Sequence, residues 1–234
     1  AMAMAIALIV DAVSDPLVGI WSDRVRSRWG RRHPFMYAAI IPFAASYYML
    51  LKDPGDISDQ TLFIRLLVLL IILRISMTFY EVPRGALGPE LSKDYDQRNA
   101  LSAWSMAFGW IGGAGIAFIA NRYFLDSFVD LEGYQSLAFW GGLGIFVCGA
   151  ISCLGTHQSI PQLHTPELRS MNILVLLREA KETLANRSWI VLFLAGCFYS
   201  LLVGLEQGVG TYYNEYLWQW KPEEIAIFSL VAVL

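Results

Sequence analysis

Six long apolar runs constrain this chain more than any other feature of its sequence. Each run has roughly twenty residues, the length that an α-helix needs to cross about 30 Å of hydrocarbon. Soluble domains rarely combine 56% hydrophobic residues with 16% charged ones. We therefore predict an all-α membrane protein, a helical bundle with six complete membrane-spanning helices and the start of a seventh after Pro222. The complete runs cover residues 4–21, 35–51, 62–82, 101–120, 136–155 and 189–212.

The connections between the runs alternate in charge. Residues 23–32 are rich in arginine, whereas residues 52–59 and 126–132 are acidic. Cationic connections are retained on the cytoplasmic side of a membrane. We therefore place the arginine-rich connections in the cytoplasm and the acidic ones outside.

The longest polar stretch contains two prolines and an amphipathic segment over 171–184, which predicts a helix on the cytoplasmic surface. Both chain ends fall in or beside apolar runs, so we expect a fragment of a longer protein. The expected parts are an N-terminal helical bundle over 1–155, a cytoplasmic linker over 156–187 and the start of a second bundle over 188–234.

Charged residues inside the apolar runs are the candidates for function. Asp11 and Asp15 are four residues apart, so both carboxylates project from one face of the first helix. A carboxylate at membrane depth costs at least about 2.5 kcal/mol, and a second one nearby adds repulsion unless a cation intervenes. Ser14 adds a neutral oxygen. We predict that these residues bind a hard cation or exchange a proton.

A second polar stripe lies in the third run, where Arg74, Thr78 and Glu81 share one helical face. Arg74 lies too deep to reach water easily, so it must pair with a carboxylate or meet a ligand. Two alternatives remain open. Arg74 pairs with Asp11, Asp15 or Glu81, or its guanidinium binds the substrate in bidentate fashion.

The sixth run is interrupted by Glu206 and Gln207 and followed by tyrosines and tryptophans. Polar and aromatic groups together suit a sugar-like solute, so Gln207 is a candidate for solute binding. The alternative for the aromatic residues is an interfacial belt, which we favour for Trp218 and Trp220.

Other distinctive residues predict packing rather than chemistry. Glycines within the runs let helices approach closely. The cysteines and histidines have no metal-ligand spacing, and the sequence contains no nucleophile elbow or phosphate-binding glycine loop. We therefore expect no enzyme and no cofactor. The residues concerned are Cys148, Cys153, Cys197, His33, His157 and His164.

Three segments carry a resemblance to a known family. They are DAVSDPLVG at 11–19 followed by SRWGR at 27–31, EVPRGALGPEL at 81–91, and YYNEY at 212–216. With them the chain resembles the melibiose permease family, the glycoside, pentoside and hexuronide cation symporters. The resemblance covers nearly the whole chain.

The resemblance implies a major facilitator fold, running from its second membrane helix into the eighth, with alternating access between two halves. It implies that Asp11, Ser14, Asp15 and Thr78 bind the coupling cation, sodium or a proton, with Asp11 and Asp15 as the ligands of a sodium ion. It further implies a monomer in the bilayer of a bacterial inner membrane, a small solute as partner and no nucleic acid.

Substrate binding by the same resemblance falls on Glu81, which stands where the family has a sugar-contacting aspartate. The chain has Trp104 and Ser105 where some members carry an arginine, and Trp104 joins Glu81, Arg74 and Gln207 as a substrate-binding candidate. We hypothesise that Arg74 supplies the missing positive charge at Ser105.

Gating by the arginine-rich turn is also implied, with Asp23, Arg28, Arg31 and Glu90 as its residues. Plain retention of positive charge in the cytoplasm explains the arginines equally well. The predicted function is cation-coupled symport of a sugar or glycoside. The alternative is transport of a lysolipid or another amphiphile on the same fold.

Overall fold

The computed structural model describes residues 2–162 and 182–231, and these residues form helices and short connections without a strand. Six helices are long and apolar enough to cross a membrane, which confirms the predicted all-α bundle. The seventh apolar run forms a shorter helix, α8 (Pro222–Val231). The six long helices are α1 (Met2–Arg24), α2 (His33–Leu51), α3 (Asp59–Leu87), α4 (Tyr95–Ile119), α5 (Leu131–His157) and α7 (Arg187–Tyr212).

Polar side chains fix where the helices begin. Ser58 accepts a hydrogen bond from the Thr61 backbone N–H at the start of α3. Asp94, Asp130 and Asn186 cap α4, α5 and α7 in the same way. Such caps satisfy backbone donors that the first helical turn leaves unpaired.

Short helical segments extend or follow the long helices. A 3₁₀ turn, η1 (Gly88–Glu90), follows α3, and another, η3 (Ile160–Gln162), follows α5. The ends of α4 and α7 widen into π-helical turns, η2 (Ala120–Phe124) and η4 (Tyr213–Leu217).

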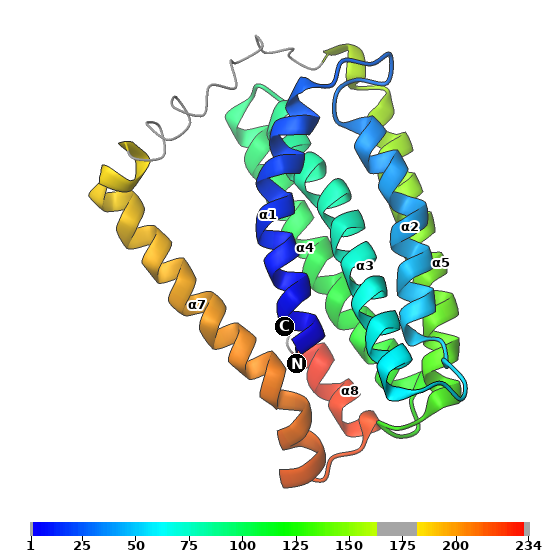
Figure 1. The fold of residues 1–234 in the computed structure, drawn as a ribbon. Coiled ribbons are helices and arrows are strands. Elements are labelled where there is room, and N and C mark those ends of the chain that lie inside the picture. Colours follow the sequence, from blue (N-terminus) through cyan, green and yellow to red (C-terminus); the bar gives the residue numbers. More distant parts are fainter. Residues whose placement is uncertain (1, 163–181, 232–234) are drawn as a thin grey trace.

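The helices do not pack equally. α2 lies between α3 and α5, and α1 packs along α3 (Figure 1). α4 packs against α8 beside η2, whereas α7 runs apart from α1–α5 over most of its length (Figure 1). The part of the chain that can position a site most firmly is therefore the layer of α1, α3, α2 and α5.

Glycines explain the close approach of α5 to α2. A Cβ atom at Gly141 would lie 2.6 Å from the Tyr47 ring, and one at Gly149 would lie 3.2 Å from Cγ1 of Ile40. The predicted packing role of glycine is met here. In α4, by contrast, Cβ atoms would meet only open space within the described part of the chain at Gly109, Gly112, Gly113 and Gly115.

The tightest packing joins α2, α3 and α5. Met36, Ile40, Leu87 and Cys153 form one buried cluster, and Cys153 is the small packing residue that we predicted. The thiols of Cys148 and Cys197 are free and lie on exposed helix faces.

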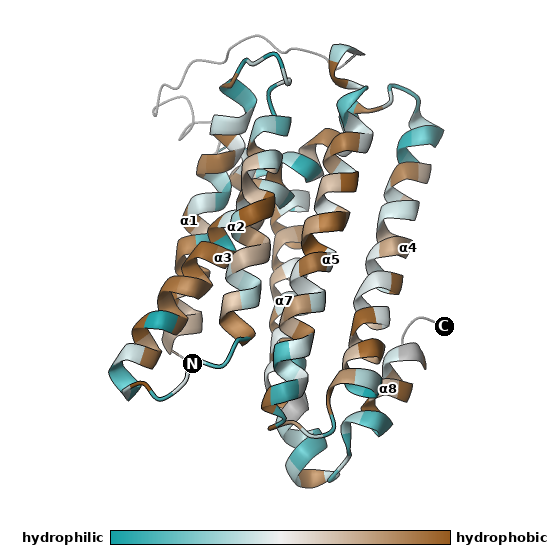
Figure 2. Ribbon diagram, turned by 90° about the vertical axis from the view of Figure 1, so that its right-hand side faces the viewer, coloured by the Kyte–Doolittle hydropathy of each residue, from teal (hydrophilic) through white to brown (hydrophobic). Residues whose placement is uncertain are grey.

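Opposite charges collect at opposite ends of the bundle. The arginine-rich connection between α1 and α2 lies at the same end as η1 and η3, which we call the arginine-rich end (Figure 1). The acidic connections lie at the other end, and hydrophobic residues dominate the helices between the two ends (Figure 2). His164 and nearly all of the predicted surface helix over 171–184 lie outside the described residues. The division into two bundles and a linker stays a prediction.

Candidate functional site

The intramembrane charges of α1 and α3 meet where these two helices pack against each other. Arg74 Nη1 lies 3.1 Å from Oδ2 of Asp11, so of the two alternatives that the sequence left open the structure shows pairing with a carboxylate. Both side chains are partly shielded, with 28% of Arg74 and 23% of Asp11 exposed. The ion pair offsets the cost of placing each charge at this depth.

Thr78 places a hydroxyl between the two carboxylates of α1. Its Oγ1 lies 2.8 Å from Oδ1 of Asp15 and 3.2 Å from Oδ1 of Asp11. Ser14 Oγ lies 3.3 Å from Oγ1 of Thr78. Thr78 is only 3% exposed, so its hydroxyl is held by packing as well as by hydrogen bonds. One hydroxyl proton cannot serve both carboxylates fully.

Four side-chain oxygens therefore converge from Asp11, Ser14, Asp15 and Thr78. Hard cations prefer such oxygen ligands. Among residues 2–162 and 182–231, no three histidine, cysteine, aspartate or glutamate side chains gather at one point, so the donor set is not that of a transition-metal centre. Two carboxylates and Arg74 leave one net negative charge, which a monovalent cation or a proton can balance.

Glu81 lies on the same face of α3 but has a partner of its own. Arg84 Nη1 lies 3.1 Å from Oε2 of Glu81, and Arg84 Nη2 donates a hydrogen bond to Oγ of Ser105 at 3.3 Å. The hypothesis that Arg74 supplies the positive charge at Ser105 is therefore wrong. Arg84 supplies it, because Ser105 faces the end of α3 while Arg74 is engaged by Asp11.

A second charged cluster lies at the arginine-rich end, and we call it the arginine clasp. It consists of Asp23, Arg31, Arg32 and Glu90. Arg31 and Arg32 both bind Glu90, and Arg32 Nη2 lies 3.1 Å from Oδ1 of Asp23. The clasp joins the α1–α2 connection to η1.

Arg28 does not join the clasp in the described part of the structure. Its guanidinium lies over the Trp29 ring, 5.5 Å from the centroid. Arg32 takes the place that we predicted for Arg28. The Nε and Nη1 atoms of Arg32 and Oε2 of Glu90 are buried without a hydrogen-bond partner among the described residues. The gating role of these residues stays a prediction.

Two substrate-binding candidates lie away from the carboxylates. Trp104 is 64% exposed on α4 and stacks on Phe108, with 5.8 Å between ring centroids. Gln207 lies on an exposed face of α7, the helix that stands apart (Figure 1). Within the described part of the chain, neither Trp104 nor Gln207 contacts Asp11 or Asp15.

Sequence reasoning also missed a polar link between α2 and α5. His33 Nε2 lies 3.0 Å from Oγ1 of Thr156, and the Tyr37 hydroxyl lies 2.8 Å from Nδ1 of His157. The two imidazole rings are 5.9 Å apart. No sequence signal could pair them, because they are 124 positions apart and join only when α2 packs on α5.

Six apolar helices, opposite charges at the two ends and paired charges at depth define a multi-pass membrane protein of the transporter type. The family model described as MFS/sugar transport protein matches residues 1–234. The chain belongs to this family, whose members are transporters rather than enzymes. Its predicted family and its place in a membrane are thereby confirmed.

Three relatives illustrate the match. The putative glycoside/cation symporter YagG of Escherichia coli (strain K12) is 34% identical over 79% of this chain and 39% of its own length. The inner membrane symporter YicJ of the same strain is 26% identical over 89% of the chain and 44% of its own length. The lactose permease of Lactobacillus delbrueckii subsp. bulgaricus is 24% identical over 89% of the chain and 34% of its own length. The chain thus spans less than half the length of these relatives.

Proposed function

We propose that the protein is a cation-coupled symporter of a sugar or glycoside, and that Asp11, Ser14, Asp15 and Thr78 hold the coupling cation. The observation that carries the proposal is the Thr78 hydroxyl, which lies within 3.2 Å of both carboxylates. A cation bound there would be ligated directly by the carboxylate and hydroxyl oxygens, in place of the hydrogen bonds that Thr78 now shares between the two carboxylates. The printed names of the relatives, a glycoside/cation symporter and a lactose permease, support a sugar solute.

Charge balance gives the cation its role in coupling. The cluster carries one uncompensated negative charge at membrane depth. Removing this charge from contact with water costs free energy until a cation binds. Sodium and a proton both meet this need. In an alternating-access cycle, the loaded cluster would let the protein close around its solute, and the unloaded cluster would resist closure.

We call Asp11, Ser14, Asp15 and Thr78, together with Arg74, the cation cluster. Sugar binding is proposed for side chains that follow this cluster along α3 and for side chains of α4. Glu81 offers a half-exposed carboxylate as a hydroxyl acceptor, and 48% of its side chain is accessible. Trp104 and Phe108 offer a stacked aromatic surface against which a sugar ring can pack. We further propose a monomer in a bacterial inner membrane, as for the relative named an inner membrane symporter.

Uptake by the full-length protein in proteoliposomes tests this function. A sodium or proton gradient is imposed, and accumulation of a panel of glycosides is compared with that of a lysolipid. Glycoside uptake that is driven by one cation, and abolished in both Asp11→Asn and Asp15→Asn, supports the proposal. The control is Asp56→Asn in the acidic loop, which should transport normally.

Each alternative has its own outcome. Uptake of the lysolipid alone would replace the sugar by an amphiphile. Unchanged cation-driven uptake in the Asp11→Asn and Asp15→Asn variants would remove these residues from the cation site.

A further inference from the structure

Arg74 lies beside Asp11 because α1 and α3 pack in a parallel register. Both helices run toward the arginine-rich end (Figure 1). Contacts between them recur about once per helical turn at a constant offset of 63 positions. They bring together Asp11 and Arg74, Asp15 and Thr78, and Gly19 and Val82. Pairing of Arg74 with Asp15 instead would require the two helices to slide by a full turn.

Arg74 and the bound cation can use different oxygens of Asp11. Arg74 Nη1 lies 3.1 Å from Oδ2, whereas Oδ1 of the same carboxylate lies 3.2 Å from Oγ1 of Thr78. Oδ1 of Asp15 lies 2.8 Å from that hydroxyl oxygen. A cation near the Thr78 hydroxyl can therefore be ligated by both carboxylates while Arg74 stays paired with Asp11. Arg74 lowers the charge of the site without occupying the position of the cation.

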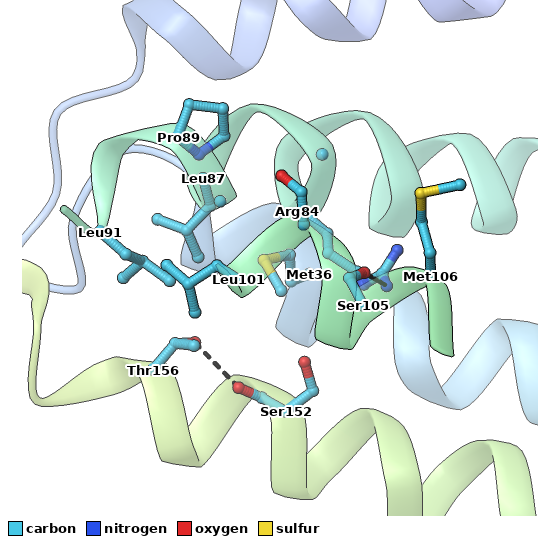
Figure 3. A pocket seen from close by; sticks show the side chains of 13 residues that line it. Met36, Arg84, Leu87, Pro89, Leu91, Leu101, Ser105, Met106, Ser152 and Thr156 are labelled. Atoms are coloured by element: carbon cyan, nitrogen blue, oxygen red, sulfur yellow. Dashed lines mark hydrogen bonds between the residues drawn. The ribbon is translucent and has the colours of Figure 1, made fainter. Parts of the chain in front are cut away.

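The next arginine along α3 does not contribute to this balance. Arg84 pairs with Glu81 and donates a hydrogen bond to Ser105. Figure 3 shows Arg84 extended toward Ser105 at a cavity of about 400 Å³ between α3, α4 and α5. Within the described part of the chain, Arg74 is thus the arginine of α3 that sets the charge at the two carboxylates.

The net charge of an oxygen site decides which cations it can hold. Calcium takes several oxygen ligands, and its affinity depends on how many of them are charged. Without Arg74, the carboxylates of Asp11 and Asp15 would offer calcium two negative charges beside two hydroxyls. With Arg74 in place, a divalent ion would leave a net positive charge at membrane depth, next to a guanidinium that repels it. A monovalent ion leaves the cluster neutral.

We propose that Arg74 is a specificity-determining residue, which limits the cation cluster to one monovalent cation and excludes divalent ones. The inference rests on the proposed cation-coupled symport and adds the residue that sets the valence of the coupling ion. Arg74 acts as a fixed counter-charge on Asp11 and stays in place when the cation binds.

Thermal melting of the full-length protein in detergent tests the proposal, with calcium chloride compared with choline chloride at equal ionic strength. We expect calcium to bind Arg74→Gln at least about tenfold more tightly than the wild type. Calcium should therefore raise the melting temperature of this variant and leave that of the wild type unchanged. Arg74→Lys should behave like the wild type, because it keeps the positive charge.

A double variant makes the test independent of whether Arg74→Gln folds. Asp15→Asn alone leaves Asp11 and Arg74 as a neutral pair, and it should not respond to the coupling cation. Asp15→Asn combined with Arg74→Gln restores one negative charge, on Asp11. The response to sodium or to pH that the wild type shows should then return. If it stays absent in the double variant, the proposal is wrong.

The control is Arg65→Gln, which removes a guanidinium from the other end of α3, where it donates to the carbonyls of Met49 and Lys52. It should not gain a response to calcium. A calcium response in the wild type, or its absence in folded Arg74→Gln, would overturn the proposal.

The outcomes separate this inference from the proposed function. A wild type that responds to sodium or to pH, with the same cation preference in Arg74→Gln, would leave the cation site and take away the role of Arg74. A wild type that responds to neither would remove the cation site and this inference together.

Discussion

The cation cluster and the arginine clasp are built from the same residue types but differ in charge. In the cluster, Asp11 and Asp15 face one arginine, Arg74, so the sum is one negative charge. In the clasp, Asp23 and Glu90 face Arg31 and Arg32, so the sum is zero. The charges of the clasp balance one another, whereas those of the cluster leave one negative charge unbalanced.

Burial sharpens this contrast. The side chain of Arg32 is 7% exposed, and it is shared by two carboxylates on separate segments. Asp23 is 55% exposed, but Arg31, Arg32 and Glu90 are 12%, 7% and 23% exposed, so removing Glu90 strands two shielded guanidinium groups and should lower stability. A partly open group with unbalanced charge is suited to reversible binding. The difference predicts that mutations in the clasp act on stability and mutations in the cluster act on ion response.

The largest effect should follow from Glu90→Gln. Both arginines of the clasp then lose their common partner, and Arg32 stays buried beside Asp23 alone. We expect the free energy of unfolding to fall by about 3 kcal/mol, as for other broken buried ion pairs. Unfolding of the full-length protein in a titration with sodium dodecyl sulfate measures this change.

Glu132→Gln provides the matched control, because it removes the same charge from an exposed position in the first turn of α5. This variant should unfold like the wild type. If Glu90→Gln were no less stable than the control, the clasp would not hold the structure together.

A second effect should appear in the response to cations. In the wild type, sodium should raise the melting temperature relative to choline, by up to the equivalent of about 2.7 kcal/mol at a hundred times the dissociation constant. Asp15→Asn leaves Asp11 and Arg74 as a neutral pair, so the response should vanish. Thermal melting of the full-length protein in sodium and choline chloride provides the measurement.

Asp23→Asn is the informative partner variant for this test. It lowers stability by weakening the clasp, but it should keep the sodium response because the cluster is intact. A pH response that is lost in Asp15→Asn, together with the absence of a sodium response in the wild type, would assign the proton as the coupling ion. A sodium response that persists in Asp15→Asn would contradict the cation site.

A smaller effect should follow from removing one hydroxyl. Thr78→Val keeps the shape of the side chain but takes away the oxygen that lies between the carboxylates. We expect the cation concentration for half-maximal uptake to rise about tenfold, while Thr78→Ser stays close to the wild type. Equal values for the valine and serine variants would show that the hydroxyl is not a ligand.

The fold and half of the site could be read from the sequence because both depend on helical periodicity. The apolar runs have the length of membrane helices, and Asp11 and Asp15 share a face whatever their surroundings are. The choice of Asp11 as the partner of Arg74 required the packing of α1 on α3.

Arg84 shows what the sequence could not give. Its spacing of three from Glu81 was visible, but its contact with Ser105 depends on where α4 lies and how far a flexible side chain extends. The π-helical ends of α4 and α7 were likewise not predicted, because they carry no distinct pattern of apolar residues. Contacts within one helix follow from spacing, whereas contacts between helices follow from packing.

The smallest effect should arise at a carboxylate that is stabilised by the backbone instead of by a cation. Asp130 lies in the connection before α5, where hydrogen bonds from the backbone of Gly133 and Asp126, the former being the larger cause, lower its pKa below the usual value. A lowered pKa in the folded state means that Asp130 stabilises the protein above its pKa in the unfolded chain. This stabilisation is lost as the pH falls through the folded pKa.

Asp130→Ala should therefore melt slightly below the wild type at neutral pH, because α5 loses its cap. The difference should shrink in acid, below the ordinary pKa of an aspartate, where the wild-type carboxylate becomes protonated and accepts these hydrogen bonds less well. Melting curves of both proteins between neutral and acidic pH measure the change. A difference that does not depend on pH would mean that Asp130 caps α5 through the shape of its side chain and not through its charge. The backbone donors would then not stabilise the carboxylate of Asp130, in contrast to Arg74 and Thr78, which stabilise that of Asp11.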